Sequence, residues 1–255
     1  MRHQREGVHL RVLVILLLAV TITTASHPAP LEAAPPSLIL HSVVLVGRRN
    51  PQTGEYVAIG TAFHVGGGLF RTAAHVATAT LPRRYEGRGF DEMGLYQADE
   101  FGNPARWLGR VEVTCVDARW QGRGEPTVFP HDSAVLKLID GTSPTEFLQA
   151  SVRRPAPGEA ISVWGFPEGS VLFEARSTIG FVSDVWIRFQ DALGKPIVGG
   201  HSGSPAIDAT GGVVGILVGG QRGVLAQNSA VPIRDAEQGC STPWAGGPTT
   251  QGGNR

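Results

Sequence analysis

Three short segments of the sequence contain side chains that together could carry out nucleophilic catalysis. The first ends in His75 and the second contains Asp132. The third contains Ser202, with Gly200 two residues before it and Gly203 directly after it. The chain order histidine, aspartate, serine is one of the few in which a serine nucleophile, its general base and an orienting carboxylate are assembled. The sequence therefore predicts a serine hydrolase, and a protease is the favoured interpretation.

Each residue type in this set has a chemical reason. A serine hydroxyl is a poor nucleophile at neutral pH unless an adjacent base takes its proton. The ordinary pKa of a histidine, about 6.5, allows His75 to accept that proton and return it. Asp132 would hold the imidazole in the correct tautomer, and Gly200 and Gly203 would permit the backbone torsions that make an oxyanion hole from the amides of Gly200 and Ser202.

Each segment taken singly also has a purely structural interpretation. His75 could be a buried histidine bound to backbone, and Asp132 could be a turn residue that opens a strand. A Gly-X-Ser-Gly sequence occurs in many loops and is weak evidence by itself. The joint order, with each segment next to an apolar strand-like run, favours the catalytic interpretation.

At these residues the chain resembles the trypsin-like (chymotrypsin-fold) serine peptidases, and within them the bacterial glutamyl-endopeptidase-like and HtrA-like branches, without a PDZ domain. The resemblance extends roughly from Val43 to Ile233. It is carried by Gly60-Thr61-Ala62-Phe63, Arg71-Thr72-Ala73-Ala74-His75-Val76, Thr178-Ile179-Gly180-Phe181-Val182-Ser183, Gly215-Ile216-Leu217-Val218-Gly219-Gly220 and Ala230-Val231-Pro232-Ile233.

The resemblance implies an all-β fold of two six-stranded antiparallel barrels with the active site between them. It implies Ser202 as nucleophile, His75 as general base, Asp132 as its orienter, and an acyl-enzyme intermediate in the hydrolysis of peptide bonds. Substrate backbone is expected to pair with the segment Leu217, Val218, Gly219 and Gly220. No cofactor is expected, and the intervals between histidines and cysteines predict no zinc or other metal site.

Three positions depart from relatives of known specificity. His201 stands where the animal digestive branch has an aspartate that pairs with a new amino terminus, so activation by that ion pair is not expected. Leu217 stands where the glutamate-specific branch has a histidine. The segment 195–198 before the nucleophile contains no carboxylate that could attract arginine or lysine. A neutral, apolar side chain is therefore expected in the primary specificity pocket.

The composition agrees with one β-rich catalytic domain. The chain has 255 residues, with 34 glycines, 18 prolines and 17% charged residues, which favours many turns over long helices. We expect the peptidase domain at 38–234, with barrel one at about 38–140 and barrel two at about 159–234. The formal net charge is zero, so no nucleic-acid partner is expected. The protein is expected to be a monomer.

Apolar runs predict the strands. In barrel one they are expected at Leu38–Val46, Tyr56–Val65, Gly68–Ala73, Val111–Val116 and Ala134–Ile139, with a short helical turn at Ala74–Thr80 and an unassigned polar insert at Pro82–Gly109. In barrel two they are expected at Ala160–Trp164, Val171–Arg176, Thr178–Ser183, Pro205–Ile207, Val213–Val218 and Ser229–Ile233.

The amino-terminal segment has the layout of a secretory signal peptide. Arginines precede the apolar run Val12–Val20, and small residues follow, with cleavage expected after Ala25. The alternative is an uncleaved membrane tether through residues 12–22. Either way the domain is expected outside the cytoplasm: secreted, periplasmic, or anchored on the outer face of a membrane. Residues 26–37 are expected to form a linker, and 241–255 a disordered tail.

The two cysteines, Cys115 and Cys240, have two interpretations. They could form one disulfide in an oxidising compartment, or Cys115 could be a buried free thiol in a strand. The spacing does not decide between them. Neither cysteine is expected to be catalytic.

Two other functions are compatible with part of this pattern. An esterase with a serine elbow on an α/β fold needs a histidine after the nucleophile, and no histidine follows Ser202. The second alternative is a catalytically silent trypsin-like homologue that binds peptides or proteins, which the intact set of three residues argues against.

Overall fold

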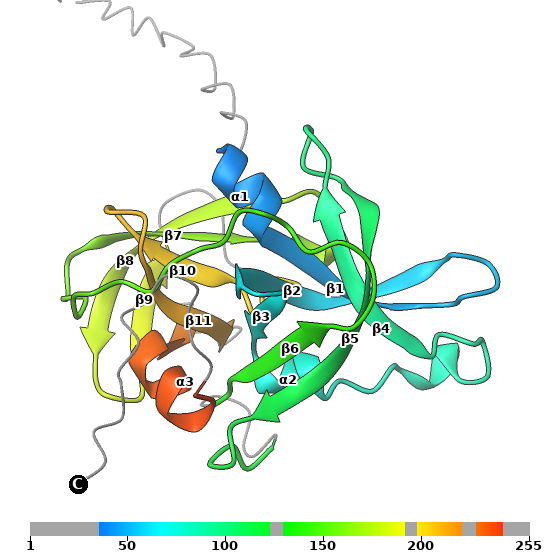
Figure 1. Ribbon diagram of the computed structural model, residues 1–255. Helices are drawn as coiled ribbons and strands as arrows, with labels where there is room; N and C mark the ends of the chain where they lie inside the picture. The colour runs from blue at the N-terminus through cyan, green and yellow to red at the C-terminus, as the bar shows by residue number, and fades with distance from the viewer. Residues whose placement is uncertain (1–35, 123–129, 192–197, 221–227, 242–255) are drawn as a thin grey trace, which may run out of the picture. The chain divides into compact units, whose positions relative to one another are not determined.

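The strands form two closed antiparallel barrels. The structure, a computed structural model, describes residues 36–122, 130–191, 198–220 and 228–241. Figure 1 shows the barrels. The first contains β1 (Val43–Arg49), β2 (Tyr56–Gly66), β3 (Leu69–Thr72), β4 (Glu92–Ala98), β5 (Pro104–Val116) and β6 (Ala134–Leu138), and the second contains β7 (Ala160–Gly165), β8 (Phe173–Val182), β9 (Ile187–Asp191), β10 (Pro205–Asp208), β11 (Val213–Gly220) and β12 (Asn228–Pro232).

The two barrels have the same connectivity. Neighbouring strands follow the order β1-β2-β3-β6-β5-β4 in the first barrel and β7-β8-β9-β12-β11-β10 in the second. Every named strand pair is antiparallel. The predicted all-β fold of two six-stranded barrels is therefore confirmed.

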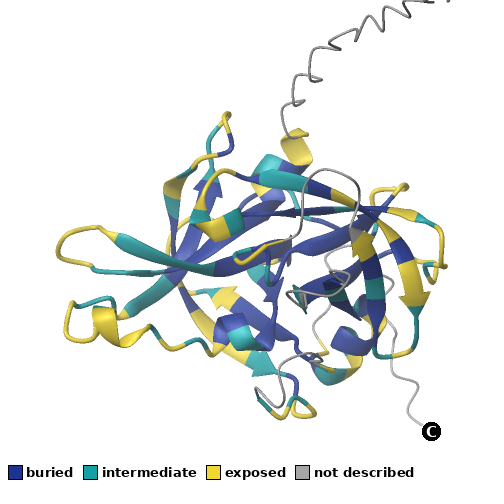
Figure 2. Ribbon diagram, turned by 180° about the vertical axis from the view of Figure 1, so that it is seen from behind, coloured by how far each residue is buried: buried dark blue, intermediate teal, exposed yellow. Residues whose placement is uncertain are grey.

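The core follows from the alternation of side chains along the strands. In β8, for example, Ala175, Ser177 and Ile179 are buried while the intervening Arg176 and Thr178 are exposed. Figure 2 shows the buried residues concentrated in the strands, and most of the connecting loops exposed.

One hydrophobic cluster extends across both barrels. It includes side chains of β1 and β2 in the first barrel and of β7, β11 and β12 in the second, namely Leu45, Phe63, Trp164, Ile216 and Val231. A shared apolar core fixes one barrel against the other, because separating them would expose this surface to water. The loops where the two barrels meet therefore keep fixed positions relative to one another.

The first element corrects the prediction of a strand from Leu38. Residues Ser37–Ser42 form the helix α1, and β1 begins only at Val43. The amides of Ile39 and Leu40 donate to the carbonyl of Pro36 at 2.8 and 3.1 Å, which starts the helical turn. A short apolar run fits a buried strand and a buried helix equally well, so periodicity could not separate them.

Two strands, β4 and β9, were not predicted from the sequence, and two predicted strands form the single strand β8. β4 lies within the insert that the sequence left unassigned; its Gly94 leaves no room for a Cβ because the ring of Trp107 in β5 packs on it. Glycine weakens the sequence signal of a strand. β9 is a short strand of alternating residues between β8 and β12, and β8 is continuous where Val171–Arg176 and Thr178–Ser183 were predicted separately.

Two short helices complete the part that positions the site. α2 (Ala74–Ala77) lies inside the predicted helical turn, and α3 (Ile233–Gly239) follows β12 without having been predicted. No helix in the described residues is long and apolar enough to cross a membrane. The predicted signal peptide, nearly all of the linker and all but the first residue of the tail lie outside the described residues, and the predicted domain limits remain predictions.

Candidate active site

His75 and Asp132 meet because the strands next to them pair. Thr72, the last residue of β3, is the register partner of Ala134, the first residue of β6. The chain that leaves β3 and the chain that enters β6 therefore lie at the same end of an antiparallel pair. His75 is three residues beyond Thr72, in α2, and Asp132 is two residues before Ala134.

The carboxylate of Asp132 holds His75 at two points. Its Oδ1 accepts a hydrogen bond from the backbone amide of His75 at 2.9 Å, and its Oδ2 accepts one from Nδ1 of the imidazole at 2.6 Å. The Asp132 side chain is fully buried and that of His75 is 15% exposed. Since a carboxylate oxygen accepts, Nδ1 is the donor of this hydrogen bond, and Nε2 is the ring nitrogen on the side away from Asp132.

The segment that contains Ser202 comes from the second barrel but is fixed to the first. The carbonyl of Ser202 accepts from the amide of Thr61 in β2 at 2.8 Å, and the Thr61 hydroxyl donates to the carbonyl of Gly200 at 2.8 Å. The same hydroxyl accepts from the amide of Phe166 at 3.1 Å. No role for Thr61 was predicted from the sequence. The one feature that could have indicated a role is its hydroxyl group within an otherwise apolar strand.

Gly60 marks the place where the two halves of the site approach each other. A Cβ built on Gly60 would lie 2.7 Å from a methyl group of Val76, the neighbour of His75, and 2.9 Å from the carbonyl oxygen of Ser202. Only a glycine at this position allows the segment with His75 and the segment with Ser202 to come this close.

The glycines that flank Ser202 are required by the backbone. Gly200 has φ +95° and Gly203 has φ +88°, which is the left-handed region. A Cβ on Gly200 would clash with the carbonyl of Phe166, and one on Gly203 with the carbonyl of Thr61. In the part of the chain that the structure describes, the amides of Gly200 and Ser202 donate to no protein acceptor. They are thus available to an external oxygen atom.

His201 points away from solvent, behind the Ser202 segment. Its side chain is fully buried, its Nδ1 lies 3.2 Å from the carbonyl oxygen of Val198, and its ring meets Phe173 edge-on. Within the described residues Nε2 has no hydrogen-bond partner. Burial lowers the pKa of His201 below its ordinary value, and the hydrogen bond to Val198 offsets part of that effect.

We expect His201 to make the folded protein less stable at mildly acidic pH. Its pKa is lower when folded than when unfolded, so below about 6.5 the unfolded chain takes up a proton that the folded chain does not. The free energy of unfolding should therefore fall as pH drops from 7.5 to 5.5, by at most about 1.4 kcal/mol per pH unit. Denaturant unfolding at both pH values measures it.

The control for this prediction is the variant His201→Gln, which does not titrate in that range. His64 is also buried with a lowered pKa, so some pH dependence should remain in the variant. The difference between the two proteins isolates His201. Equal pH dependence in both would contradict the assignment.

The predicted substrate-binding segment divides into two parts. The side chain of Leu217 is 1% exposed and packs in the core of the second barrel, away from solvent. Its backbone holds the segment that contains Ser202: its carbonyl accepts from the amide of Gly203 at 2.7 Å, and its amide donates to the carbonyl of Ser204 at 2.9 Å.

The second part lies beyond Leu217. The register of β11 with β12 shifts between Leu217 and Gly219, and Gly219 and Gly220 pair with Ser229 and Asn228. Pairing with β10, on the other side of β11, ends at Ile216. Along Val218–Gly220 that side of the strand has no partner strand in the described residues.

Cys115 and Cys240 form a disulfide, with their Cα atoms 5.9 Å apart. The bond joins β5 of the first barrel to the residue after α3, which follows the second barrel. Of the two interpretations left open by the sequence, the structure contains the bridge.

The comparisons with known proteins agree with this geometry. A family model described as trypsin-like peptidase domain matches residues 60–216. No curated protein sequence matches the chain. Among solved structures, the active form of the Rv3671c protease from M. tuberculosis superimposes with a TM-score of 0.54 at 18% identity, covering 84% of this chain and 92% of that one.

Two further structures show the same fold. A serine endoprotease from Yersinia pestis has a TM-score of 0.57 at 17% identity and is matched over 81% of this chain and 66% of its own length. An HtrA-type protease solved with a tripeptide has a TM-score of 0.55 at 17% identity, over 79% of this chain and 60% of its own. The family match spans more than half of the sequence and includes the segments of His75, Asp132 and Ser202, so the chain belongs to the trypsin-like peptidase family.

Proposed function

We propose that this serine-type peptidase is an endopeptidase in which Ser202 is the nucleophile, His75 the general base and Asp132 the residue that orients His75. The observation that carries the proposal is the pair of hydrogen bonds that the buried Asp132 carboxylate accepts from the backbone amide and Nδ1 of His75. That arrangement fixes both the position of the imidazole and its tautomer, which is what a base acting through Nε2 requires.

Acylation is the first half of the proposed reaction. Ser202 Oγ attacks the carbonyl carbon of the scissile peptide bond while Nε2 of His75 takes the hydroxyl proton. The carbonyl oxygen becomes an oxyanion, which accepts hydrogen bonds from the amides of Gly200 and Ser202. The carbon–nitrogen bond then breaks, His75 gives its proton to the departing amine, and an ester of Ser202 remains.

Deacylation repeats these roles with water. His75 takes a proton from a water molecule as the water oxygen attacks the ester carbon, and the same two amides hold the second oxyanion. The ester bond breaks, the proton passes to Ser202 Oγ, and a carboxylic acid is released. The enzyme returns to its starting state and needs no cofactor for these steps.

The alternative is a catalytically silent homologue that binds peptides, and covalent labelling separates the two. A fluorophosphonate probe reacts only with a serine that an adjacent base activates. We expect one adduct per chain, located at Ser202 by peptide mass mapping, and release of product from a peptide substrate. An unlabelled protein that still binds peptides would support the silent alternative.

Substrate is proposed to bind as an added strand. The side of β11 along Val218–Gly220 without a partner strand in the described residues offers backbone groups that an extended peptide can use. Such pairing supplies affinity without reading side chains. Selectivity then depends on the pocket that receives the residue before the scissile bond, whose sequence segment 195–198 contains no carboxylate.

We expect cleavage after small or medium apolar residues such as alanine, valine or leucine. A charged side chain buried without a partner would cost several kcal/mol. Profiling with a peptide library, followed by kcat/KM on matched peptides that differ only at this residue, measures the preference. A profile dominated by glutamate, arginine or lysine would contradict it and assign the pocket charge to residues 190–195 or 221–227.

The location of the enzyme is proposed to be outside the cytoplasm, as a secreted, periplasmic or membrane-tethered monomer. The signal-like amino-terminal sequence and the Cys115–Cys240 disulfide both support this proposal, since disulfides persist in oxidising compartments. Residues 12–22 are the candidate tether if the segment is not cleaved. Proteins or peptides are the expected partners.

A further inference from the structure

The aspartate proposed to orient His75 lies in a tight and strained turn. His131, the residue before Asp132, has φ +61°, a conformation that costs free energy for any residue with a side chain. The amide of Ser133 donates to the carbonyl of His131 at 2.8 Å, and the carbonyl of Ser133 accepts from the amide of Asp117 at 3.0 Å. Because Asp132 is enclosed by these contacts, the backbone at residues 131–133 sets the direction of its carboxylate.

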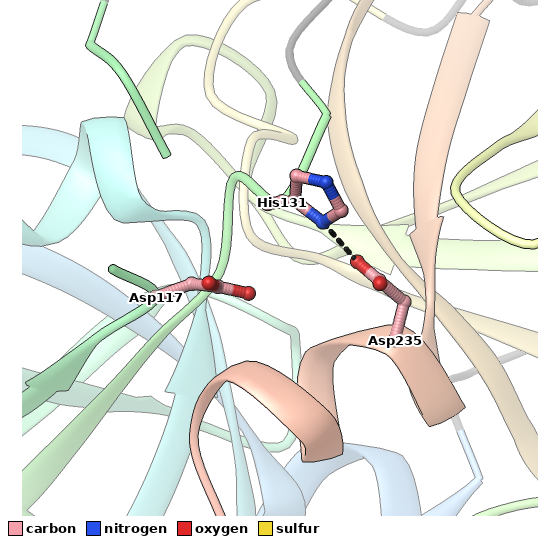
Figure 3. A group of neighbouring side chains, drawn as sticks. All are labelled: Asp117, His131 and Asp235. Carbon is pink, nitrogen blue, oxygen red and sulfur yellow. Dashed lines mark hydrogen bonds and ion pairs between the residues drawn. The ribbon is translucent and has the colours of Figure 1, made fainter. Parts of the chain in front are cut away.

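The side chain of His131 ties this turn to the carboxyl-terminal helix. Its Nδ1 donates to Oδ2 of Asp235 in α3 at 2.8 Å, and Figure 3 shows the ring directed at that carboxylate. Asp235 is 5% exposed. We infer that His131 and Asp235 are positioning residues, which hold the 131–133 turn so that Asp132 can orient His75.

Arg119 lies next to His131 and Asp235 and places a positive charge between the carboxylates of Asp117 and Asp235. Its guanidinium donates to Oδ2 of Asp117 at 2.7 Å and to Oδ1 of Asp235 at 2.9 Å. Burial raises the pKa of Asp117, but hydrogen bonds from Arg119 and the charges of Arg119 and His131 outweigh it, so the pKa lies below its ordinary value. The three residues Asp117, His131 and Asp235 have the composition of a metal site, yet Arg119 already bridges both carboxylates.

α3 is attached to the first barrel independently of His131. Cys240, just after the helix, forms the disulfide with Cys115 of β5, and its carbonyl accepts from the buried side chain of Arg71 at 3.2 Å. Arg71 is in β3, the strand that leads to His75; burial lowers its pKa to about 10, against the opposing effect of Glu237. These attachments should keep α3 in place when the His131–Asp235 contact is removed.

The inference rests on the proposed function, because positioning Asp132 matters only if His75 acts as a base. Removing the contact should let the turn at residues 131–133 relax, and the alignment of Asp132 with His75 would then be lost in part of the population. A misplacement of this kind lowers the rate of the chemical step more than substrate binding. Lower kcat at nearly constant KM is therefore its signature.

The test compares His131→Asn, Asp235→Ala and the double variant with wild type. Asparagine tolerates positive φ but is too short to replace the imidazole contact, so His131→Asn adds no backbone strain at this position and removes only the contact with Asp235. We expect kcat to fall by about 10- to 100-fold in each single variant, with KM within twofold of wild type. The double variant should lose little more than Asp235→Ala alone, because the His131–Asp235 contact is already absent from that single variant.

The matched control is the ion pair of Arg154 and Asp184, which are 2.9 Å apart at the surface with side chains 56% and 89% exposed. Asp184→Asn should leave kcat and KM unchanged. If His131→Asn also keeps kcat within twofold of wild type, the inference is wrong. Thermal unfolding of every variant shows whether the protein is folded at the assay temperature.

A second measurement does not depend on turnover. In the Ser202→Ala background, the Nδ1 proton of His75 should give a strongly deshielded NMR resonance, because it lies in a short charge-assisted hydrogen bond to Asp132. We expect His131→Asn to shift or broaden it and Asp184→Asn to leave it unchanged. An unchanged resonance in His131→Asn would overturn the inference even if Asp235→Ala fails to fold.

The two proposals fail in different ways. A wild-type protein that does not react with a fluorophosphonate contradicts the proposed function. The response of the His75 resonance to His131→Asn then still decides whether the tie to α3 positions Asp132.

Discussion

Replacing Ser202 by alanine is expected to lower kcat/KM for a peptide substrate by about six orders of magnitude, the scale at which a triad nucleophile contributes. The change removes one oxygen atom from a half-exposed position, and the backbone contacts of Ser202 with Thr61 do not involve that oxygen. The fold should therefore be preserved. Hydrolysis rates, fluorophosphonate labelling and Tm measured on the same preparation check all three parts.

Ser204→Ala is the matched control, since it removes the same group two residues away. The Ser204 hydroxyl is fully buried and faces the backbone of Gly165, where a Cβ would collide with it. It is out of reach of a substrate carbonyl. We expect Ser204→Ala to be labelled at the wild-type rate, so loss of labelling in this variant together with labelled Ser202→Ala would contradict the nucleophile assignment.

The parts of the site that the sequence could predict are those encoded locally. His75, Asp132 and Ser202 each lie in a short segment whose neighbours are glycines or strand residues with a recognisable role. The strands around them could be read from apolar alternation because one face of each strand is buried. The predicted meeting of His75 with Asp132 follows directly from the pairing of β3 with β6.

The parts that the sequence could not predict depend on contacts between distant residues. Thr61 clamps the loop of Gly200 only because the second barrel folds against the first. α3 was missed because its sequence is short and largely polar, and it is held by Asp235 and Cys240 through partners in the other barrel. The burial of the Leu217 side chain could not be predicted because strand alternation does not reveal which face of β11 meets the barrel core.

Asp132→Asn is expected to lower kcat by about four orders of magnitude at neutral pH. Both carboxylate oxygens of Asp132 are acceptors, one for the amide of His75 and one for Nδ1. An asparagine has only one acceptor oxygen. If that oxygen keeps the backbone amide, the side-chain NH₂ faces the ring and makes Nδ1 the acceptor, which moves the ring proton to Nε2 and removes the lone pair that Ser202 needs.

Asp140 at the other end of β6 provides a control with the same pattern of hydrogen bonds. Its Oδ1 accepts from the backbone amide of Arg110 and its Oδ2 from the Arg110 side chain, both at 2.6 Å. Asp140→Asn therefore tests the loss of a carboxylate held by one backbone and one side-chain donor, without a histidine. It should leave kcat within severalfold of wild type. A loss in Asp140→Asn equal to that in Asp132→Asn would mean that the strand framework, rather than the tautomer of His75, accounts for the effect.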